Sequence, residues 1–460
     1  MSSVIIDNWT PRLSYGVAGA IASAAGSALH PPLNSRPMEN VLPMLIADDP
    51  DALVELCGVN LLERLLRILQ RLGFRRAFVL STTPEIVGAE VAKRSWPREK
   101  VVVHVVSGAT GPLTPQVVLE QGPSERFLIV PANIYCDARL LAALCTKDSS
   151  AALVDSNPPE FARSLIRSPC GPSLVTKDFL SAFPSTVPFF EQLKERIGNR
   201  KIDIVDAAEQ DDYIVSMRRR VRPVCFPAPP EQNRRVAERI ILDSAQNGTL
   251  DLPAYFHAPI ETGIISLLCK TRITPNQITM AGFIIGSGTT AAFALGRVGL
   301  GILAALIFGI IDGLDGKQAR VKIEMTEGGK WEHHLDYFIE NSWWTAIAFY
   351  LWRTSQLPSV FYFFALLIGS HLLDEFAKRR AKIAIGRLLD DATPFDRVFR
   401  LIAARRNVYV WTLACGFLLD AFPQSYVIIC GWAAFSAAVH LVRSIWICDN
   451  AVRRLIGIRS

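Results

Sequence analysis

The second half of the chain contains long stretches without a charged residue, and these restrict its possible folds more than any other feature. Three stretches reach the roughly 20 residues that a membrane helix needs: residues 273–296, 354–373 and 421–442. Three shorter stretches reach that length only together with the polar residues at their ends: residues 298–311, 341–352 and 407–419. Backbone in lipid must satisfy its own hydrogen bonds, which favours helices. We therefore predict an all-α membrane domain of six transmembrane helices over residues 273–460; four spans with two buried or re-entrant helices are the alternative.

The first half has the pattern of a globular domain. Short apolar runs bounded by Gly and Pro predict buried strands at residues 42–46, 77–80, 101–106 and 127–130, and helical spacing predicts a helix over residues 61–72. Strands that alternate with helices indicate an α/β domain with a mostly parallel sheet.

The domain boundaries follow from changes in composition. Residues 1–40 form an N-terminal extension with weak signals, and residues 41–222 form the α/β domain. Residues 223–272 are a connector: prolines open it, and an amphipathic helix at residues 255–270 is expected at the membrane surface. The nine cysteines lack regular spacing, which is typical of reduced thiols.

Five acidic residues stand beside the apolar runs. Asp312 and Asp315 are three residues apart at the end of one predicted membrane helix, and Glu332, Asp336 and Glu340 follow at intervals of four at the start of the next. Carboxylates near hydrocarbon are costly and indicate function. Because these spacings place carboxylates on one face of each helix, we expect a site for a hard divalent cation, Mg²⁺ or Mn²⁺.

The acidic segment resembles the signature of the CDP-alcohol phosphotransferase family, D-x-x-D-G-x-x-A-R followed by Gly and two further Asp. Asp312, Asp315, Gly316, Ala319 and Arg320 match the first half at every fixed position. In the second half, the usual spacing places His333 and Tyr337 in the two Asp positions. A spacer shorter by one residue places Glu332 and Asp336 there. We prefer the shorter spacing because it keeps carboxylates for metals; His333 and His334 stay open as contributors.

The resemblance implies an integral membrane transferase that moves a phosphoalcohol group from a CDP-alcohol to a hydroxyl acceptor, either a polyol phosphate or a lipid. It implies metal ligands at Asp312, Asp315, Glu332 and Asp336, with Asp336 also accepting the proton of the acceptor hydroxyl. Seven positions are expected to bind substrate: Gly316, Ala319 and Arg320 in the motif, Asn276 and Thr279 at the entry to the first membrane helix, and Arg405 and Arg406 before the fifth.

The basic residues predict how the protein lies in the membrane. The segment between the fourth and fifth predicted helices contains nine Lys and Arg residues, whereas the loops after the first and third contain only Arg297 and Arg353. Basic loops stay in the cytoplasm, so we expect a multi-pass protein of the cell membrane with both termini and the active site on the cytoplasmic side. The net charge of +6 is modest and local. We therefore expect no nucleic-acid partner; a homodimer is compatible with the sequence.

The first half resembles the nucleotidyltransferase part of bifunctional enzymes that make CDP-inositol and then di-myo-inositol phosphate phosphate. Residues 58–66 resemble the segment after the nucleotide loop, but Asn133 replaces a metal-binding acid. An acidic loop at residues 46–51 stands where a Gly-rich basic loop would bind triphosphate, and it would repel an anion. We interpret this half as a non-catalytic relic. One alternative is a bifunctional enzyme that makes its own CDP-alcohol from CTP, and another is a transporter or scaffold that only binds ions.

Overall fold

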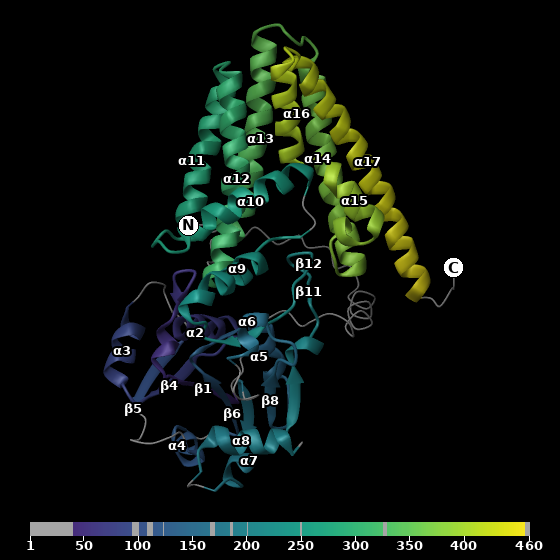
Figure 1. Ribbon diagram of the computed structural model, residues 1–460. Helices are drawn as coiled ribbons and strands as arrows, with labels where there is room; N and C mark the ends of the chain where they lie inside the picture. The colour runs from purple at the N-terminus through teal and green to yellow at the C-terminus, as the bar shows by residue number, and fades with distance from the viewer. Residues whose placement is uncertain are drawn as a thin grey trace, which may run out of the picture.

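The protein is described by a computed structural model that covers residues 40–93, 101–107, 114–122, 124–165, 171–184, 187–199, 201–248, 251–324 and 329–455, with the side chains of residues 329–335 and 452–455 outside the description. An α/β domain is followed by a helical domain, and the two lie at opposite ends of the molecule (Figure 1). The segment 1–39 lies outside the described residues, so the predicted extension stays a prediction.

The α/β domain contains a seven-stranded sheet of order β10-β8-β9-β6-β1-β4-β5. Only β9 is antiparallel to its neighbours, so the predicted mostly parallel sheet is confirmed. The strands are β1 (Val41–Ile46), β4 (Arg76–Ser81), β5 (Val102–Ser107), β6 (Arg126–Pro131), β8 (Ala151–Val154), β9 (Ser173–Thr176) and β10 (Asp203–Asp206). Six short strands pair outside it: β2 (Glu55–Leu56) with β3 (Val59–Asn60), β7 (Ile134–Cys136) with β13 (Cys225–Pro227), and β11 (Tyr213–Ile214) with β12 (Arg219–Arg220).

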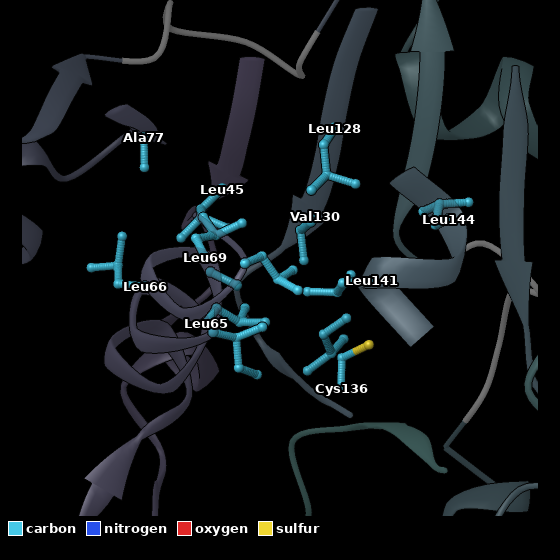
Figure 2. Close-up of a cluster of buried hydrophobic side chains, with 14 of the residues drawn as sticks. Leu45, Leu65, Leu66, Leu69, Ala77, Leu128, Val130, Cys136, Leu141 and Leu144 are labelled. Carbon is cyan, nitrogen blue, oxygen red and sulfur yellow. The ribbon is translucent and has the colours of Figure 1, made fainter. Parts of the chain in front are cut away.

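Helices cover both faces of this sheet. Side chains alternate along β1, so that Leu45 packs with the helix α2 on one face while Met44 and Ile46 pack against the other face. Figure 2 shows the α2 side, where Leu65 and Leu69 lie against the strands. The helices of this domain are η1 (Pro50–Leu53), α2 (Leu61–Arg71), α3 (Pro84–Ala92), α4 (Pro115–Glu120), α5 (Ala138–Cys145), α6 (Glu160–Arg163), α7 (Lys177–Ser181), α8 (Phe189–Gly198), η2 (Ala207–Glu209) and η3 (Glu231–Asn233).

The C-terminal half is helical throughout its described length. Its elements are α9 (Arg234–Ser244), α10 (Leu252–Leu268), α11 (Pro275–Ala294), α12 (Val298–Lys322), α13 (Gly329–Arg353), α14 (Val360–Ile385), η4 (Leu389–Asp391), α15 (Pro394–Ile402), α16 (Arg406–Leu418) and α17 (Phe422–Leu455). Among the residues that the structure describes, three helices, α12, α14 and α17, are long and apolar enough to cross a membrane. The sequence predicted six such spans; α11, α13 and α16 pack beside these three (Figure 1), and their role as spans stays a prediction.

Local sequence explains where the first of these helices begins. Thr274 and Gln277 form a capping box, and Pro275 occupies the first turn of α11, where its missing N–H costs nothing. The basic segment between α14 and α16 is not a plain loop as expected, because it contains α15. Thr393 caps α15, and the Asp396 carboxylate accepts hydrogen bonds from Arg443 of α17. This ion pair ties the basic segment to the last helix.

Candidate functional site

Two cavities meet at Asp312 on α12. The first, called here the acidic cavity, has a volume of about 20 Å³ and is lined by Ile278, Thr279, Gly282, Phe283, Phe308, Ile311, Asp312, Asp315, Asp336 and Ile339. The second, the polar cavity, has a volume of about 150 Å³ and is lined by Arg218, Gln246, Asn247, Asp251, Ala254, His257, Glu261, Gly309, Asp312, Gly313, Lys317, Arg320, Arg400 and Asn407. Asp312 is therefore accessible from both.

The acidic cavity brings three of the predicted carboxylates together. Asp312 and Asp315 come from one face of α12, because residues three apart are neighbours on a helix, and Asp336 comes from α13. Tyr337, the competing residue in the other spacing of the motif, is 51% exposed. This placement favours Asp336 for the last acidic position. The side chains of Glu332, His333 and His334 lie outside the described residues, so the choice between the spacings stays a prediction.

Each α12 carboxylate already has a partner. Asp315 is buried and accepts hydrogen bonds from Thr279 Oγ1 at 2.7 Å and from the Gly316 N–H at 2.6 Å. Asp312 accepts one from Arg406 Nη2 at 2.5 Å. Thr279 and Arg406 were predicted to bind substrate, and the structure places both on the acidic residues. Arg406 also stacks 4.8 Å from the ring centroid of Phe308, which holds its guanidinium beside the cavity.

The donor set of the acidic cavity fits a hard divalent cation, although the described residues do not contain a ready-made cluster. No group of three or more His, Cys, Asp or Glu side chains in the described part of the chain is close enough to hold a metal. The carboxylates of Asp312, Asp315 and Asp336 nevertheless line one cavity and offer only oxygen donors. The Arg406 cation lies where a metal would neutralise Asp312.

The polar cavity gives the motif residues further roles. Arg320 Nε donates to the carbonyl of Ala245 at the end of α9, at 2.7 Å, which turns its side chain toward this cavity. A Cβ atom added at Gly316 would lie 3.1 Å from Arg320 Nη1. Gly316 thus leaves room for the Arg320 guanidinium. Ala319 is half-buried in the same turn.

Asn276 and Arg405 are not among the residues that line either cavity, and their role in substrate binding stays a prediction. Asn276 is exposed on the first turn of α11. Arg405 is directed at acidic residues, with its Nη1 3.2 Å from Asp390 and its Nε 3.7 Å from Asp251. Burial alone would raise the pKa of Asp390, but the cations of Lys378, Arg405 and Arg400 hold that pKa well below its usual range. Arg405 therefore anchors the basic segment in this structure.

Several residues of the polar cavity were missed by sequence reasoning. Lys317 is buried beside Gly316 and pairs with Glu261 of α10 at 3.1 Å. Burial raises the pKa of Glu261, and the charge of Lys317 opposes that rise. His257 and Asn407 meet at Gly309, where an added Cβ would lie 3.2 Å from Asn407 Oδ1. Glu261 and His257, in an otherwise mainly apolar α10, were the available signal for this cavity.

The α/β domain is joined to the motif helix by buried hydrogen bonds. Arg64 of α2 donates to the Val321 carbonyl at 2.7 Å, and Arg67 donates to the Lys322 carbonyl at 2.8 Å. On the rim of the sheet, Asn133 donates to Asp49 at 3.0 Å. Asn133 and the acidic loop of residues 46–51 therefore lie together.

Comparisons with known proteins address both halves. Residues 272–386 match the model of the family described as CDP-alcohol phosphatidyltransferase. Two relatives carry the name bifunctional IPC transferase and DIPP synthase. The protein of Rubrobacter xylanophilus is 25% identical over 400 residues, which cover 81% of this chain and 87% of that protein. The protein of Thermococcus kodakarensis is 30% identical over 155 residues, and the match spans about a third of each protein, 33% of this chain and 34% of the relative.

Among solved structures, the inositol-1-phosphate CTP transferase of T. maritima aligns with 44% of this chain and 96% of its own length. Its TM-score is 0.32 at 12% sequence identity.

Proposed function

We propose that this membrane protein, whose C-terminal half carries a CDP-alcohol phosphatidyltransferase domain, transfers a phosphoalcohol group from a CDP-alcohol to a hydroxyl acceptor and releases CMP. The observation that carries the proposal is the meeting of Asp312, Asp315 and Asp336 in one cavity beside Arg320 and Arg406. Carboxylates and arginines side by side are the groups needed to bind cations and phosphate. The expected active site faces the cytoplasm, in a bundle of six membrane helices.

The reaction forms one bond and breaks one. The oxygen of the acceptor hydroxyl attacks the β-phosphorus of the CDP-alcohol, the bridging P–O bond to the α-phosphate breaks, and CMP leaves with the electron pair. Asp336 accepts the proton of the attacking hydroxyl. Arg320 holds a phosphate oxygen with its forked donors, and Gly316 leaves the space that this guanidinium occupies.

Divalent cations fit the proposal. Mg²⁺ or Mn²⁺ would be held by Asp312, Asp315 and Asp336, with Glu332 as the fourth expected ligand. When bound, such ions supply positive charge that neutralises the pyrophosphate and stabilises the departing CMP. Arg406 then has a second acceptor in the substrate phosphates.

The test is CMP release in membranes that contain the full chain, with candidate CDP-alcohols and acceptors offered separately. We expect CMP only when both substrates and Mg²⁺ or Mn²⁺ are present, and loss of release when EDTA is added. A protein that binds the metal without forming CMP under any pairing would instead be the ion-binding transporter or scaffold.

A second candidate function is supported by the relatives more than by the sheet domain itself. The Rubrobacter relative, aligned over 81% of this chain, is named as bifunctional. This favours an N-terminal domain that makes the CDP-alcohol from CTP over the relic interpretation. The acidic rim, with Asp49 bonded to Asn133, opposes an incoming triphosphate unless a metal reverses the charge.

Pyrophosphate release separates these two interpretations. The full chain is given CTP and a phosphoalcohol, and pyrophosphate is measured in the wild type and in Asp315→Ala. Release that survives Asp315→Ala assigns the first reaction to the α/β domain. No release, with CMP formation from supplied CDP-alcohol intact, leaves transfer as the single activity.

A further inference from the structure

A hairpin of the α/β domain reaches the transferase site. β11 and β12 lie between the sheet and the helical half (Figure 1), and the residues that join them include Arg218. The φ angle of Arg218 is 52°, in the left-handed region that residues other than Gly rarely adopt. Arg218 lines the polar cavity together with Asp312 and Arg320. A residue of the first domain is therefore part of the wall of a cavity that opens onto the motif.

The position of this hairpin is fixed by hydrogen bonds to backbone groups. Arg219 Nη1 donates to the carbonyl of Asp243 in α9 at 2.8 Å, and the Gly248 N–H donates to the carbonyl of Met217 at 2.8 Å. A Cβ atom at Gly248 would lie 2.4 Å from the Arg218 carbonyl oxygen. The connector thus approaches the hairpin as closely as only Gly permits, and this contact holds Arg218 in its unusual conformation.

The polar cavity gathers positively charged side chains around Arg218. Arg320, Arg400 and Lys317 line the same cavity. The three acidic lining residues each pair with a cation, Glu261 with Lys317 at 3.1 Å, Asp251 with Arg405 at 3.7 Å and Asp312 with Arg406 at 2.5 Å. Arg400 in turn pairs with Asp390. An anion that binds among these cations lowers their mutual repulsion further. A phosphate is the anion that forked guanidinium donors fit best.

Two unsatisfied atoms show that the cavity is built for a polar molecule. His257 Nδ1 and Gln246 Oε1 are buried and have no hydrogen-bond partner among the described residues. His257 is only 5% exposed, and both residues line the cavity. A buried polar atom of this kind normally has a partner, so a molecule with donors and acceptors in the cavity would supply it.

We propose that Arg218 binds a phosphate group of a substrate in the polar cavity, so that the α/β domain completes the transferase site. The inference rests on the proposed function for the identity of the reaction. The phosphate belongs either to the CDP-alcohol or to a phosphorylated acceptor, and these share the chemistry that Arg218 recognises. The α/β domain then has a role in transfer whether or not it turns over CTP.

The kinetic test compares Arg218→Gln with Arg220→Gln in the full chain. Arg220 lies on the same hairpin, is exposed, and pairs with Asp212 at 3.0 Å, so it is a matched control. We expect Arg218→Gln to raise the KM of one substrate about tenfold or more with a smaller change in kcat, and Arg218→Lys to recover part of the loss. The substrate whose KM rises identifies the source of the phosphate. KM values within twofold of the wild type for both substrates would overturn the assignment.

A binding measurement keeps the inference separate from the reaction. Inorganic phosphate should raise the thermal midpoint of the wild type and of Arg220→Gln, and should raise that of Arg218→Gln much less. Equal shifts in all three, or no shift in the wild type, would contradict phosphate binding by Arg218. If phosphate binding depends on Arg218 but no CMP is ever released, the proposed reaction fails while the anion site stands.

Discussion

Arg64 Nη1 lies 2.7 Å from the carbonyl oxygen of Val321, 257 residues later in the chain. Val321 belongs to the last turn of α12. The carbonyl groups of a last turn have no N–H donor within the helix, so they need donors from outside it. The same guanidinium donates through Nη2 to the carbonyl of Leu56 at 2.9 Å. A single buried side chain of the α/β domain therefore links the β2–β3 pair to the helix that carries Asp312 and Asp315.

We predict that Arg64→Met destabilises the protein by about 2–4 kcal/mol, because two buried carbonyls lose their donor. Arg64 is 2% exposed, so water cannot readily replace its guanidinium as the donor to these carbonyls. The same burial lowers the pKa of the guanidinium. Thermal or urea unfolding of the detergent-solubilised chain measures the change. Arg75→Met, at an exposed position that follows α2, is the control and should change stability little. Equal stability of Arg64→Met and the wild type would show that α12 does not depend on this contact.

We predict that Asp315→Ala lowers CMP release by far more than tenfold while membrane insertion is unchanged. Asp315 is buried, bonded to Thr279, and lines the acidic cavity, so its loss removes an expected metal ligand that nothing nearby replaces. Asp420→Asn, which removes an exposed carboxylate at the turn between α16 and α17, is the control. Retention of more than about a tenth of the activity, a loss below roughly 1.4 kcal/mol, would exclude the metal role.

Much of the fold could be predicted because its signals are local. The run before Asp312 and the spacing of Asp312 and Asp315 place both carboxylates on one helix face, and the structure has them there. The strand at β1 and the helix α2 follow from short apolar runs and from helical spacing. These elements depend on neighbours within one or two turns, which a sequence displays directly.

The contacts between the domains could not be predicted in this way. Arg64 looks like a solvated residue of an amphipathic helix, yet it is buried against Val321. Arg218 lies between the two-residue strands β11 and β12, which show no alternating apolar pattern, and its place in the cavity depends on the later Gly248. Within the helical half, the pair of Arg405 and Asp390 has the same cause, because nothing in the sequence shows that these two residues lie together. Each case depends on tertiary packing between distant segments.

We predict that Glu332→Gln lowers CMP release at least tenfold and that His333→Gln has a much smaller effect. Only the shorter spacing of the motif keeps a carboxylate at each metal position, and Asp336, one helical turn after Glu332, lines the acidic cavity. The two variants differ from the wild type by a similar loss of one titratable group, so they are a matched pair. Metal dependence of each variant's CMP release is the measurement. The reverse ranking would establish the longer spacing, with His333 in the acidic position.

We predict that Gly313→Ala lowers activity although Gly313 is not a fixed position of the family signature. A Cβ atom there would lie 2.5 Å from Glu261 Oε1 and 2.6 Å from its Cδ, closer than real Cβ contacts come. Glu261 cannot move freely because it is 7% exposed and pairs with Lys317, which is itself buried. Displacing the Glu261 carboxylate separates this pair and shifts the wall of the polar cavity beside Asp312.

Gly288→Ala is the matched control: Gly288 lies within α11, a Cβ there meets nothing within 4 Å, and Ala is about 1 kcal/mol more favourable than Gly inside a helix. We therefore expect Gly288→Ala to keep full CMP release with equal or higher thermal stability, and Gly313→Ala to lose several-fold in kcat/KM. Full activity of Gly313→Ala would show that the contact between α10 and α12 is looser than the structure requires, and that the polar cavity does not depend on it.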